Sequence, residues 1–251
     1  MRSKLLHIIS QLCKLFLPGS FFIKIKESYC YFTDWYARKS YSQDGDDLVI
    51  ASFVENRSGP GFYVDIGAHH PMRFSNTYYF YKQGWRGINV DATPGSMTLF
   101  NRYRPRDVNI EQAVSSEKKS FKYYLFNEPA LNGFESDRTK KHLDSKTYHL
   151  DRVINIESSS LKAIFDRFLP KGHTIDFLSV DVEGMDLSVL QSNDWGLYRP
   201  CYIIAELLDD KGKFNDQNEV TNYLQDNGYA ICALGRMNGI FFDTLNSNLN
   251  H

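Results

Sequence analysis

The chain alternates short apolar runs with longer stretches in which apolar and polar residues recur at helical spacing. Short runs rich in β-branched and aromatic residues predict buried strands, and the longer stretches predict amphipathic helices that cover them. The predicted strands are residues 61–66, 86–90, 108–113, 121–126, 176–180, 201–206, 229–234 and 239–242. The predicted helices are residues 46–55, 76–83, 97–103, 159–168, 186–190 and 218–227. This alternation is typical of a doubly wound α/β domain with a mostly parallel sheet.

One stretch, residues 127–152, departs from this alternation. It is polar, rich in Lys, His, Ser and Asp, and too long for an ordinary connection between a strand and a helix. We predict a substrate-binding loop or lid here, because long polar connections that a rigid scaffold holds in place often carry binding residues.

The amino-terminal segment has a pattern of its own. Residues 1–25 combine basic side chains with apolar residues at partly helical spacing. Lys14 and the Pro18-Gly19 pair interrupt it before the ~20 apolar residues that a membrane span needs. Lys14 and the lack of a clear cleavage site also argue against a signal peptide. We predict a helical extension over residues 1–40 and one domain over 41–251. The helix either packs on the domain or rests on a membrane surface.

Composition and charge narrow the class of protein. The chain has 251 residues, of which 42% are hydrophobic and 24% charged, a balance typical of a globular enzyme. A formal charge of −1 and a pI near 6.7 argue against a nucleic-acid partner, because phosphate binding needs an excess of Lys and Arg. The four cysteines form no C-x-x-C pair, which argues against structural zinc. We expect a cytoplasmic protein, located at the inner face of the membrane if the first helix rests there.

The first candidate binding motif follows the predicted strand at 61–66. It reads FYVDIGAHHP from Phe62 to Pro71. In doubly wound sheets, ligands bind beyond the carboxyl ends of the strands, so Asp65 is expected to face a pocket. Gly67 permits a sharp turn and a close approach of the backbone to a ligand, and Ala68 adds little bulk. The motif lacks the G-x-G-x-x-G pattern of dinucleotide sites, which favours a cofactor without phosphates.

The next two strands supply further candidates. The strand at 86–90 ends at Asp91, one strand-helix-strand unit after Asp65, where a carboxylate can accept both ribose hydroxyls of an adenosine. The strand at 108–113 is expected to place Glu111, Gln112 and Ala113 beside the adenine. The pairing of Asp65 with Asp91 at this spacing predicts a nucleoside site.

Carboxylates also follow two later strands. The sequence DFLSVDVEGMD runs from Asp176 to Asp186, and it places Asp181 and Glu183 directly after a buried strand. One of these residues could instead cap the following helix, since carboxylates stabilise helix amino termini by ~0.3–1 kcal/mol each. The strand at 201–206 ends at Glu206. We therefore expect four strands to bring four carboxylates to one rim of the sheet: Asp65, Asp91, Asp181 and Glu206.

Three stretches together resemble the hallmark motifs of the FkbM family of O-methyltransferases. They are YSQDGDDL from Tyr41 to Leu48, YVDIGAHHP from Tyr63, and DFLSVDVEGMD. They occur in the right order and at sensible distances, and the resemblance extends from about Tyr41 to Phe242. The chain departs from the family pattern at His69-His70-Pro71, where many relatives carry Asn and Gly. The resemblance implies a Rossmann-like class I methyltransferase fold and S-adenosyl-L-methionine as cofactor. It also implies methylation of a sugar hydroxyl in a surface polysaccharide or secondary metabolite.

Motifs and resemblance together nominate the site residues. On the acceptor side they are Asp181, Glu183 and Glu206. The predicted cofactor-binding residues are Tyr41, Ser42, Gln43, Asp46, Asp65, Gly67, Ala68, His69, Asp91, Ala92, Gln112 and Ala113.

Methyl transfer to a sugar hydroxyl requires a group that removes the hydroxyl proton, because the hydroxyl is a weak nucleophile at neutral pH. We prefer Asp181 or Glu183 as this base. The alternatives are a histidine (His69, His70, His142 or His149) or a divalent cation that acidifies the hydroxyl. Oxygen ligands such as Asp181 and Glu206 suit Mg²⁺ or Mn²⁺ rather than zinc.

The acceptor is expected to be a glycan or a small molecule. Residues 127–135 mix amides, carboxylates and aromatics, which suits hydrogen bonding to a polar ring and stacking on it. Two other functions stay open. One is an oxidoreductase that uses NAD or a nucleotide sugar, against which the missing phosphate-binding glycines argue. The other is a nucleoside-binding module without catalysis, against which the intact carboxylates argue.

Overall fold

The computed structural model describes residues 19–33, 36–55, 59–182, 184–209 and 212–246. The chain divides into two compact units, Met1–Lys39 and Ser40–His251, each described here by itself. In the first unit, helix α2 (Gly19–Phe32) begins directly after Pro18; the remainder of the predicted amino-terminal helix, residues 1–18, lies outside the described residues. None of the helices described is both long enough and apolar enough to cross a bilayer. The two interpretations of this segment stay predictions.

The second unit is built on a seven-stranded sheet with the order β10-β11-β9-β8-β1-β2-β3. Four consecutive pairings, from β9 through β8, β1 and β2 to β3, are parallel. Only β11 runs antiparallel to its neighbours β9 and β10 within the described sheet. The predicted mostly parallel sheet is thereby confirmed. The strands are β1 (Phe62–Ile66), β2 (Arg86–Asp91), β3 (Val108–Glu111), β8 (Phe177–Val180), β9 (Tyr202–Glu206), β10 (Tyr229–Leu234) and β11 (Asn238–Asp243).

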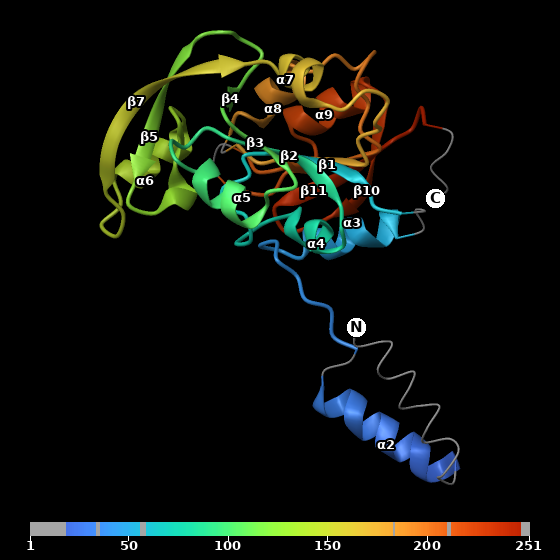
Figure 1. Cartoon of the computed structure of the whole chain (residues 1–251). Helices are drawn as coiled ribbons and strands as arrows, with labels where there is room; N and C mark the ends of the chain where they lie inside the picture. Colours follow the sequence, from blue (N-terminus) through green and yellow to red (C-terminus); the bar gives the residue numbers. More distant parts are fainter. Residues whose placement is uncertain (1–18, 34–35, 56–58, 183, 210–211, 247–251) are drawn as a thin grey trace. The chain divides into compact units, whose positions relative to one another are not determined.

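Helices cover both faces of this sheet (Figure 1). Successive side chains of a strand point to opposite faces, so Val64 of β1 joins one core and its neighbour Tyr63 the other. The Val64 side packs against α7 (Leu161–Phe168), α8 (Asp186–Gln191) and α9 (Glu219–Asp226). The Tyr63 side packs against α3 (Asp46–Val54) and α4 (Tyr78–Lys82). Helix α5 (Met97–Tyr103) packs on Ala68 in a smaller cluster. All the predicted strands and helices occur, with ends within two residues of the predictions.

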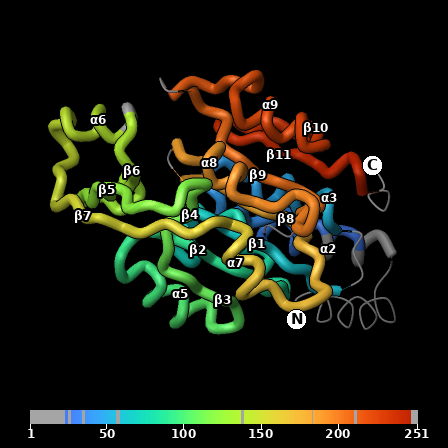
Figure 2. The backbone as a smooth tube through the Cα atoms, turned by 90° about the horizontal axis from the view of Figure 1, so that it is seen from above, coloured from blue at the N-terminus to red at the C-terminus, as the bar shows by residue number. Residues whose placement is uncertain are grey.

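A second, smaller sheet corrects the prediction for residues 127–152. Its strands have the order β4-β7-β5-β6 and project to one side of the main sheet (Figure 2). The predicted loop contains a 3-10 helix η1 (Pro129–Leu131), strand β6, helix α6 (Asp137–Leu143) and the start of β7. Residues 121–126 form a strand as predicted, but it lies in this second sheet. The strands are β4 (Ala113–Val114), β5 (Ser120–Phe126), β6 (Gly133–Phe134) and β7 (Leu150–Ser159).

Candidate functional site

A pocket lies where the carboxyl ends of β1, β2 and β8 meet the second sheet. Its empty volume is about 780 Å³, counting the solvent at its mouth. Ligands of doubly wound sheets bind at this edge. The lining residues are Gln43, Ile66, Gly67, His69, Phe74, Val90, Asp91, Ala92, Thr93, Gln112, Ala113, Val114, Tyr123, Pro129, Ala130, Asn132, Gly133, Phe134, Asp181 and Val182.

The turn after β1 depends on Gly67. Its φ is +83°, a left-handed conformation that side chains with a Cβ rarely adopt. A Cβ at this position would lie 1.8 Å from the carbonyl oxygen of Asp181. Two hydrogen bonds hold the backbones together: the Gly67 N–H donates to Val90 O (2.9 Å), and the Asp181 N–H donates to Ile66 O (3.0 Å). Because Gly67 has no side chain, the ends of β1, β2 and β8 can lie in direct contact.

Asp91 is fixed at the pocket wall through both carboxylate oxygens. Oδ2 accepts a hydrogen bond from the His69 N–H and Oδ1 one from the Thr93 N–H, each at 2.8 Å. The residue is 7% exposed and lines the pocket. Each carboxylate oxygen can accept a further hydrogen bond. The group is thus held in place to accept hydrogen bonds from a ligand with neighbouring hydroxyls.

His69 adds a neutral imidazole to the same wall. Its backbone is left-handed, with φ +52°, and its Nε2 is buried without a hydrogen-bond partner among the described residues. Burial lowers the pKa of this imidazole below its usual value of 6.5, and the nearby Asp91 carboxylate only partly offsets this. The ring is therefore neutral at pH 7 and can exchange hydrogen bonds with a ligand.

The lowered pKa of His69 predicts a contribution to the pH dependence of stability. Because the pKa is depressed in the folded state, protonation favours the unfolded chain, and this contribution to the free energy of unfolding falls as pH drops below about 6.5. We expect His69→Asn, which tolerates the left-handed backbone, to show a smaller loss of stability between pH 7.5 and pH 5.5. Urea denaturation at both pH values measures it. An equal loss in both proteins would contradict this role for His69.

The structure brings together eight of the residues predicted from the sequence. They line the pocket and are Gln43, Gly67, His69, Asp91, Ala92, Gln112, Ala113 and Asp181. Six others do not line it: Tyr41, Ser42, Asp46, Asp65, Ala68 and Glu206. Glu183 lies outside the described residues.

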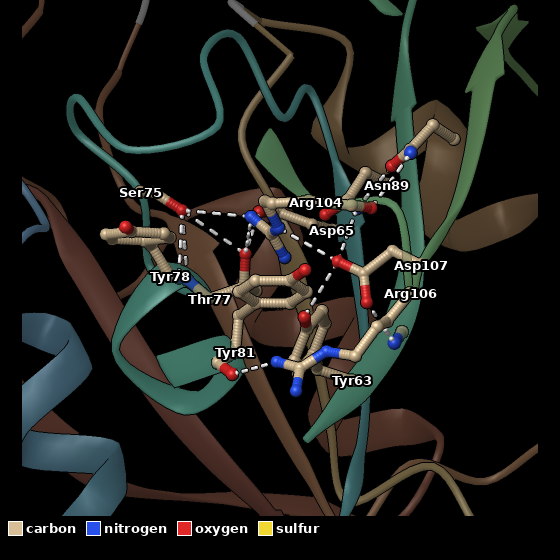
Figure 3. A network of polar contacts seen from close by, with 12 residues as sticks. Tyr63, Asp65, Ser75, Thr77, Tyr78, Tyr81, Asn89, Arg104, Arg106 and Asp107 are labelled. Atoms are coloured by element: carbon tan, nitrogen blue, oxygen red, sulfur yellow. Dashed lines mark hydrogen bonds and ion pairs between the residues drawn. The ribbon is translucent and has the colours of Figure 1, made fainter. Parts of the chain in front are cut away.

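Asp65 belongs to a buried polar network beneath the site (Figure 3). Its Oδ2 accepts a hydrogen bond from the Thr77 hydroxyl at 2.7 Å, and Thr77 also accepts one from Arg104 Nη1 at 2.9 Å. Burial raises the pKa of the Asp65 carboxyl above its usual value, an effect that the Thr77 hydrogen bond partly offsets. Asp65 alternates with Val64 and Ile66 along β1, and so it shares the sheet face of Tyr63. Its contacts here stabilise the strand and the loop that follows it.

In the segment that begins at Tyr41, most of the polar groups described form hydrogen bonds that stabilise the segment. Asp47, which was not predicted, accepts hydrogen bonds from Ser40 Oγ (2.6 Å), Tyr41 N (2.7 Å) and Ser42 Oγ (3.0 Å). Asp46 accepts one from Asn238 Nδ2 at 2.8 Å, and burial raises the pKa of its carboxyl. Gln43 is the residue of this segment that lines the pocket.

The second sheet supplies pocket residues that were not nominated. The hydroxyls of Tyr123 on β5 and Thr93 after β2 lie 3.0 Å apart and join the two sheets. The rings of Tyr123 and Phe134 meet edge to face, with centroids 5.0 Å apart. Asn132 accepts a hydrogen bond from the Phe126 N–H at 2.8 Å. For Asn132 and Phe134, the sequence feature that indicates a binding role is the mixture of amides and aromatic residues in 127–135. We interpreted that mixture as a site for the acceptor.

Glu206 lines a different pocket, of about 1250 Å³, counting open solvent. Asp181 and Glu206 were the suggested oxygen ligands for Mg²⁺ or Mn²⁺, yet they line separate pockets. Within the described part of the chain, no three His, Cys, Asp or Glu side chains come together as a metal site. The described residues therefore give no support to a divalent cation.

A comparison with models of protein families identifies the family of this chain. No curated protein matches the chain. The family model of the methyltransferase FkbM domain matches residues 65–231, about two thirds of the chain, from the end of β1 to β10. The seven-stranded, mostly parallel sheet with helices on both faces is consistent with a Rossmann-like methyltransferase fold. The suspected family is thereby confirmed, and the chain belongs to the FkbM family of methyltransferases; the motif from Tyr41 to Leu48 precedes the matched residues, and its resemblance stays a prediction.

Proposed function

We propose that the protein is an S-adenosylmethionine-dependent O-methyltransferase that acts on a sugar hydroxyl of a glycan or glycosylated metabolite. One observation carries the proposal. Asp91, fixed through both oxygens, and Asp181 line the same pocket, and the turn at Gly67 joins their strands. A nucleoside-binding carboxylate and a carboxylate suited to act as a base therefore share one cavity.

The residues of this pocket fit the proposed cofactor. Asp91 would accept hydrogen bonds from the ribose hydroxyls, and the turn at Gly67 and His69 would face the methionine part. Gln112, Ala113 and the ring of Tyr123 would surround the adenine. The Gln112 side chain is already oriented, because its Nε2 donates to Glu157 O at 2.5 Å. None of these positions needs a phosphate-binding glycine loop.

S-adenosylmethionine, when bound, supplies a methyl group on a positively charged sulfur. The acceptor hydroxyl would receive this methyl group, and a carboxylate of this chain would take the hydroxyl proton. We propose Asp181 as this base, with Glu183 as the alternative. Asp181 directly follows β8, and it is an exposed residue that lines the pocket. The protein otherwise contributes alignment of the reacting groups.

Calorimetry on the full chain tests the proposal. We expect S-adenosylmethionine and S-adenosylhomocysteine to bind and NAD to give no heat. Asp91→Ala removes hydrogen bonds to a charged group, each worth about 1.5–3 kcal/mol, and should weaken cofactor binding at least about tenfold. Asp181→Ala should bind the cofactor normally and chiefly lower turnover. Binding of NAD with indifference to both sulfur compounds would overturn the assignment.

A further inference from the structure

We infer that Phe74 is a further cofactor-binding residue, whose ring retains the ligand at the rim of the cofactor pocket, and that the Arg73–Glu128 ion pair holds the ring there. The inference rests on the proposed function, because the ligand retained is S-adenosylmethionine. Phe74 lines the same pocket as Asp91 and Asp181. The residue is 43% exposed, so it lies where the pocket opens to solvent.

The backbone of Phe74 is strained. Its φ is +57°, in the left-handed region that a residue with a bulky side chain rarely adopts. Such conformations lower stability, cluster at functional sites and persist only where the surrounding structure imposes them. A ring at the rim of a pocket gains less from burial than a core ring does, so burial offsets little of this strain. The strain therefore points to a role of the ring in ligand binding rather than in folding.

Hydrogen bonds fix the chain on both sides of Phe74. Before it, His70 Nδ1 accepts a hydrogen bond from the Arg73 N–H at 3.0 Å. After it, the Ser75 N–H donates to Tyr41 O at 3.0 Å. These contacts on either side impose the left-handed backbone at Phe74.

Two side chains contact the Phe74 ring. The His69 imidazole is nearly parallel to it, with an angle of 20° between the planes and 6.3 Å between the ring centres. The Arg73 guanidinium lies 4.4 Å from the centre of the ring, within the range of a cation–π contact. The ring is therefore held beside the His69 imidazole, which lines the same pocket.

The Arg73–Glu128 ion pair connects two segments that line the pocket. Arg73 Nη1 lies 3.1 Å from Glu128 Oε1, and both side chains are partly exposed. Arg73 precedes Phe74 in the loop after β1, and Glu128 precedes Pro129 and Ala130 in η1. The Ala130 N–H and, next, the Arg73 guanidinium hold the pKa of the Glu128 carboxyl below its usual value, so it is ionised at neutral pH. The pair therefore ties the two segments together on the solvent side of the pocket, where it would slow the release of a ligand.

Surface plasmon resonance on the immobilised full chain tests the role of the ring, because it measures the association and dissociation rates of S-adenosylhomocysteine. Phe74→Asn removes the ring, and asparagine tolerates the left-handed backbone. We expect this variant to release the ligand at least about tenfold faster, the usual scale of losing one aromatic contact.

Phe214→Asn is the matched control for this substitution. Phe214 is similarly exposed, at 39%, but it lies outside the cofactor pocket and its backbone is not left-handed. This variant should leave the release rate unchanged. Its midpoint of urea denaturation should be no higher than that of Phe74→Asn, in which the strain is relieved.

Glu128→Gln tests the role of the ion pair. It removes the charge but keeps an oxygen that can accept the Ala130 N–H. It should raise the dissociation rate severalfold and weaken the dependence of that rate on salt between about 0.05 M and about 0.5 M, because salt screens exposed ion pairs. Glu117→Gln makes the same change in the exposed ion pair with Lys119, outside the pocket, and it should alter neither quantity.

The possible results separate the inference from the proposed function. Equal release rates for the two asparagine variants, or a lower urea midpoint for Phe74→Asn than for Phe214→Asn, would overturn the role of the ring. Equal effects of Glu128→Gln and Glu117→Gln would overturn the role of the ion pair. If the unaltered protein bound no S-adenosylhomocysteine, the proposed function would fail and the inference with it.

Discussion

Arg104→Met is expected to lower the free energy of unfolding by about 3–5 kcal/mol, the usual effect of removing one partner from a buried ion pair. The Arg104 side chain is fully buried, and its Nε donates to Asp107 Oδ2 at 2.8 Å. The guanidinium also lies 5.2 Å from the centre of the Tyr63 ring. Without it, the Asp107 carboxylate would stay buried with only neutral donors, among them the Tyr63 hydroxyl at 2.9 Å.

Urea denaturation followed by circular dichroism measures this effect. Lys162→Met is the matched control, since its ion pair with Asp166 has a similar distance, 2.7 Å, but its side chains are 41% and 47% exposed. Exposed pairs of this kind contribute little to stability, because solvent screens them. The double variant Arg104→Met/Asp107→Asn should recover part of the loss, because it removes the unpaired charge. Similar losses of stability for Arg104→Met and Lys162→Met would show that burial does not raise the contribution of the Arg104–Asp107 pair to the free energy of unfolding.

Gly67→Ala should weaken binding of S-adenosylhomocysteine at least about a hundredfold, which corresponds to about 2.8 kcal/mol. The new Cβ would meet the Asp181 carbonyl oxygen at 1.8 Å, and so the ends of β1 and β8 must separate. The variant should also lose about 2–5 kcal/mol of stability, from the left-handed backbone and the overpacking together. Calorimetry and urea denaturation measure the two effects.

Gly172→Ala separates these two causes. Gly172 also has a left-handed backbone, with φ +74°, but an added Cβ would have no atom within 4 Å. It should lose only about 1–2 kcal/mol of stability and bind the ligand normally. If Gly67→Ala behaved like Gly172→Ala, the contact between the turn and Asp181 would not control the pocket.

Local sequence patterns were enough to predict the main sheet, its helices and the turn at Gly67. Buried parallel strands are nearly continuous apolar runs, and amphipathic helices repeat their apolar positions, so both leave local patterns. The turn needs a left-handed backbone, which singles out glycine. Pocket residues such as Asp91 and Asp181 could be predicted because parallel strands end at the same edge of the sheet, whereas Gln43 was predicted from the family resemblance.

The second sheet and the surroundings of Asp65 and Glu206 depend on contacts between segments that are far apart in the chain. Strand β7 is mostly exposed, and its pairing with β5 depends on backbone hydrogen bonds to a distant segment, so only the short alternation of Ile154 and Ile156 marks its inner face. That sheet brings Tyr123 and Phe134 to the pocket. Asp65 and Glu206 both follow the predicted pattern of a carboxylate near a strand end. One lies in a buried network and the other in a second pocket, because packing against α4 and α9, rather than strand position, sets their surroundings.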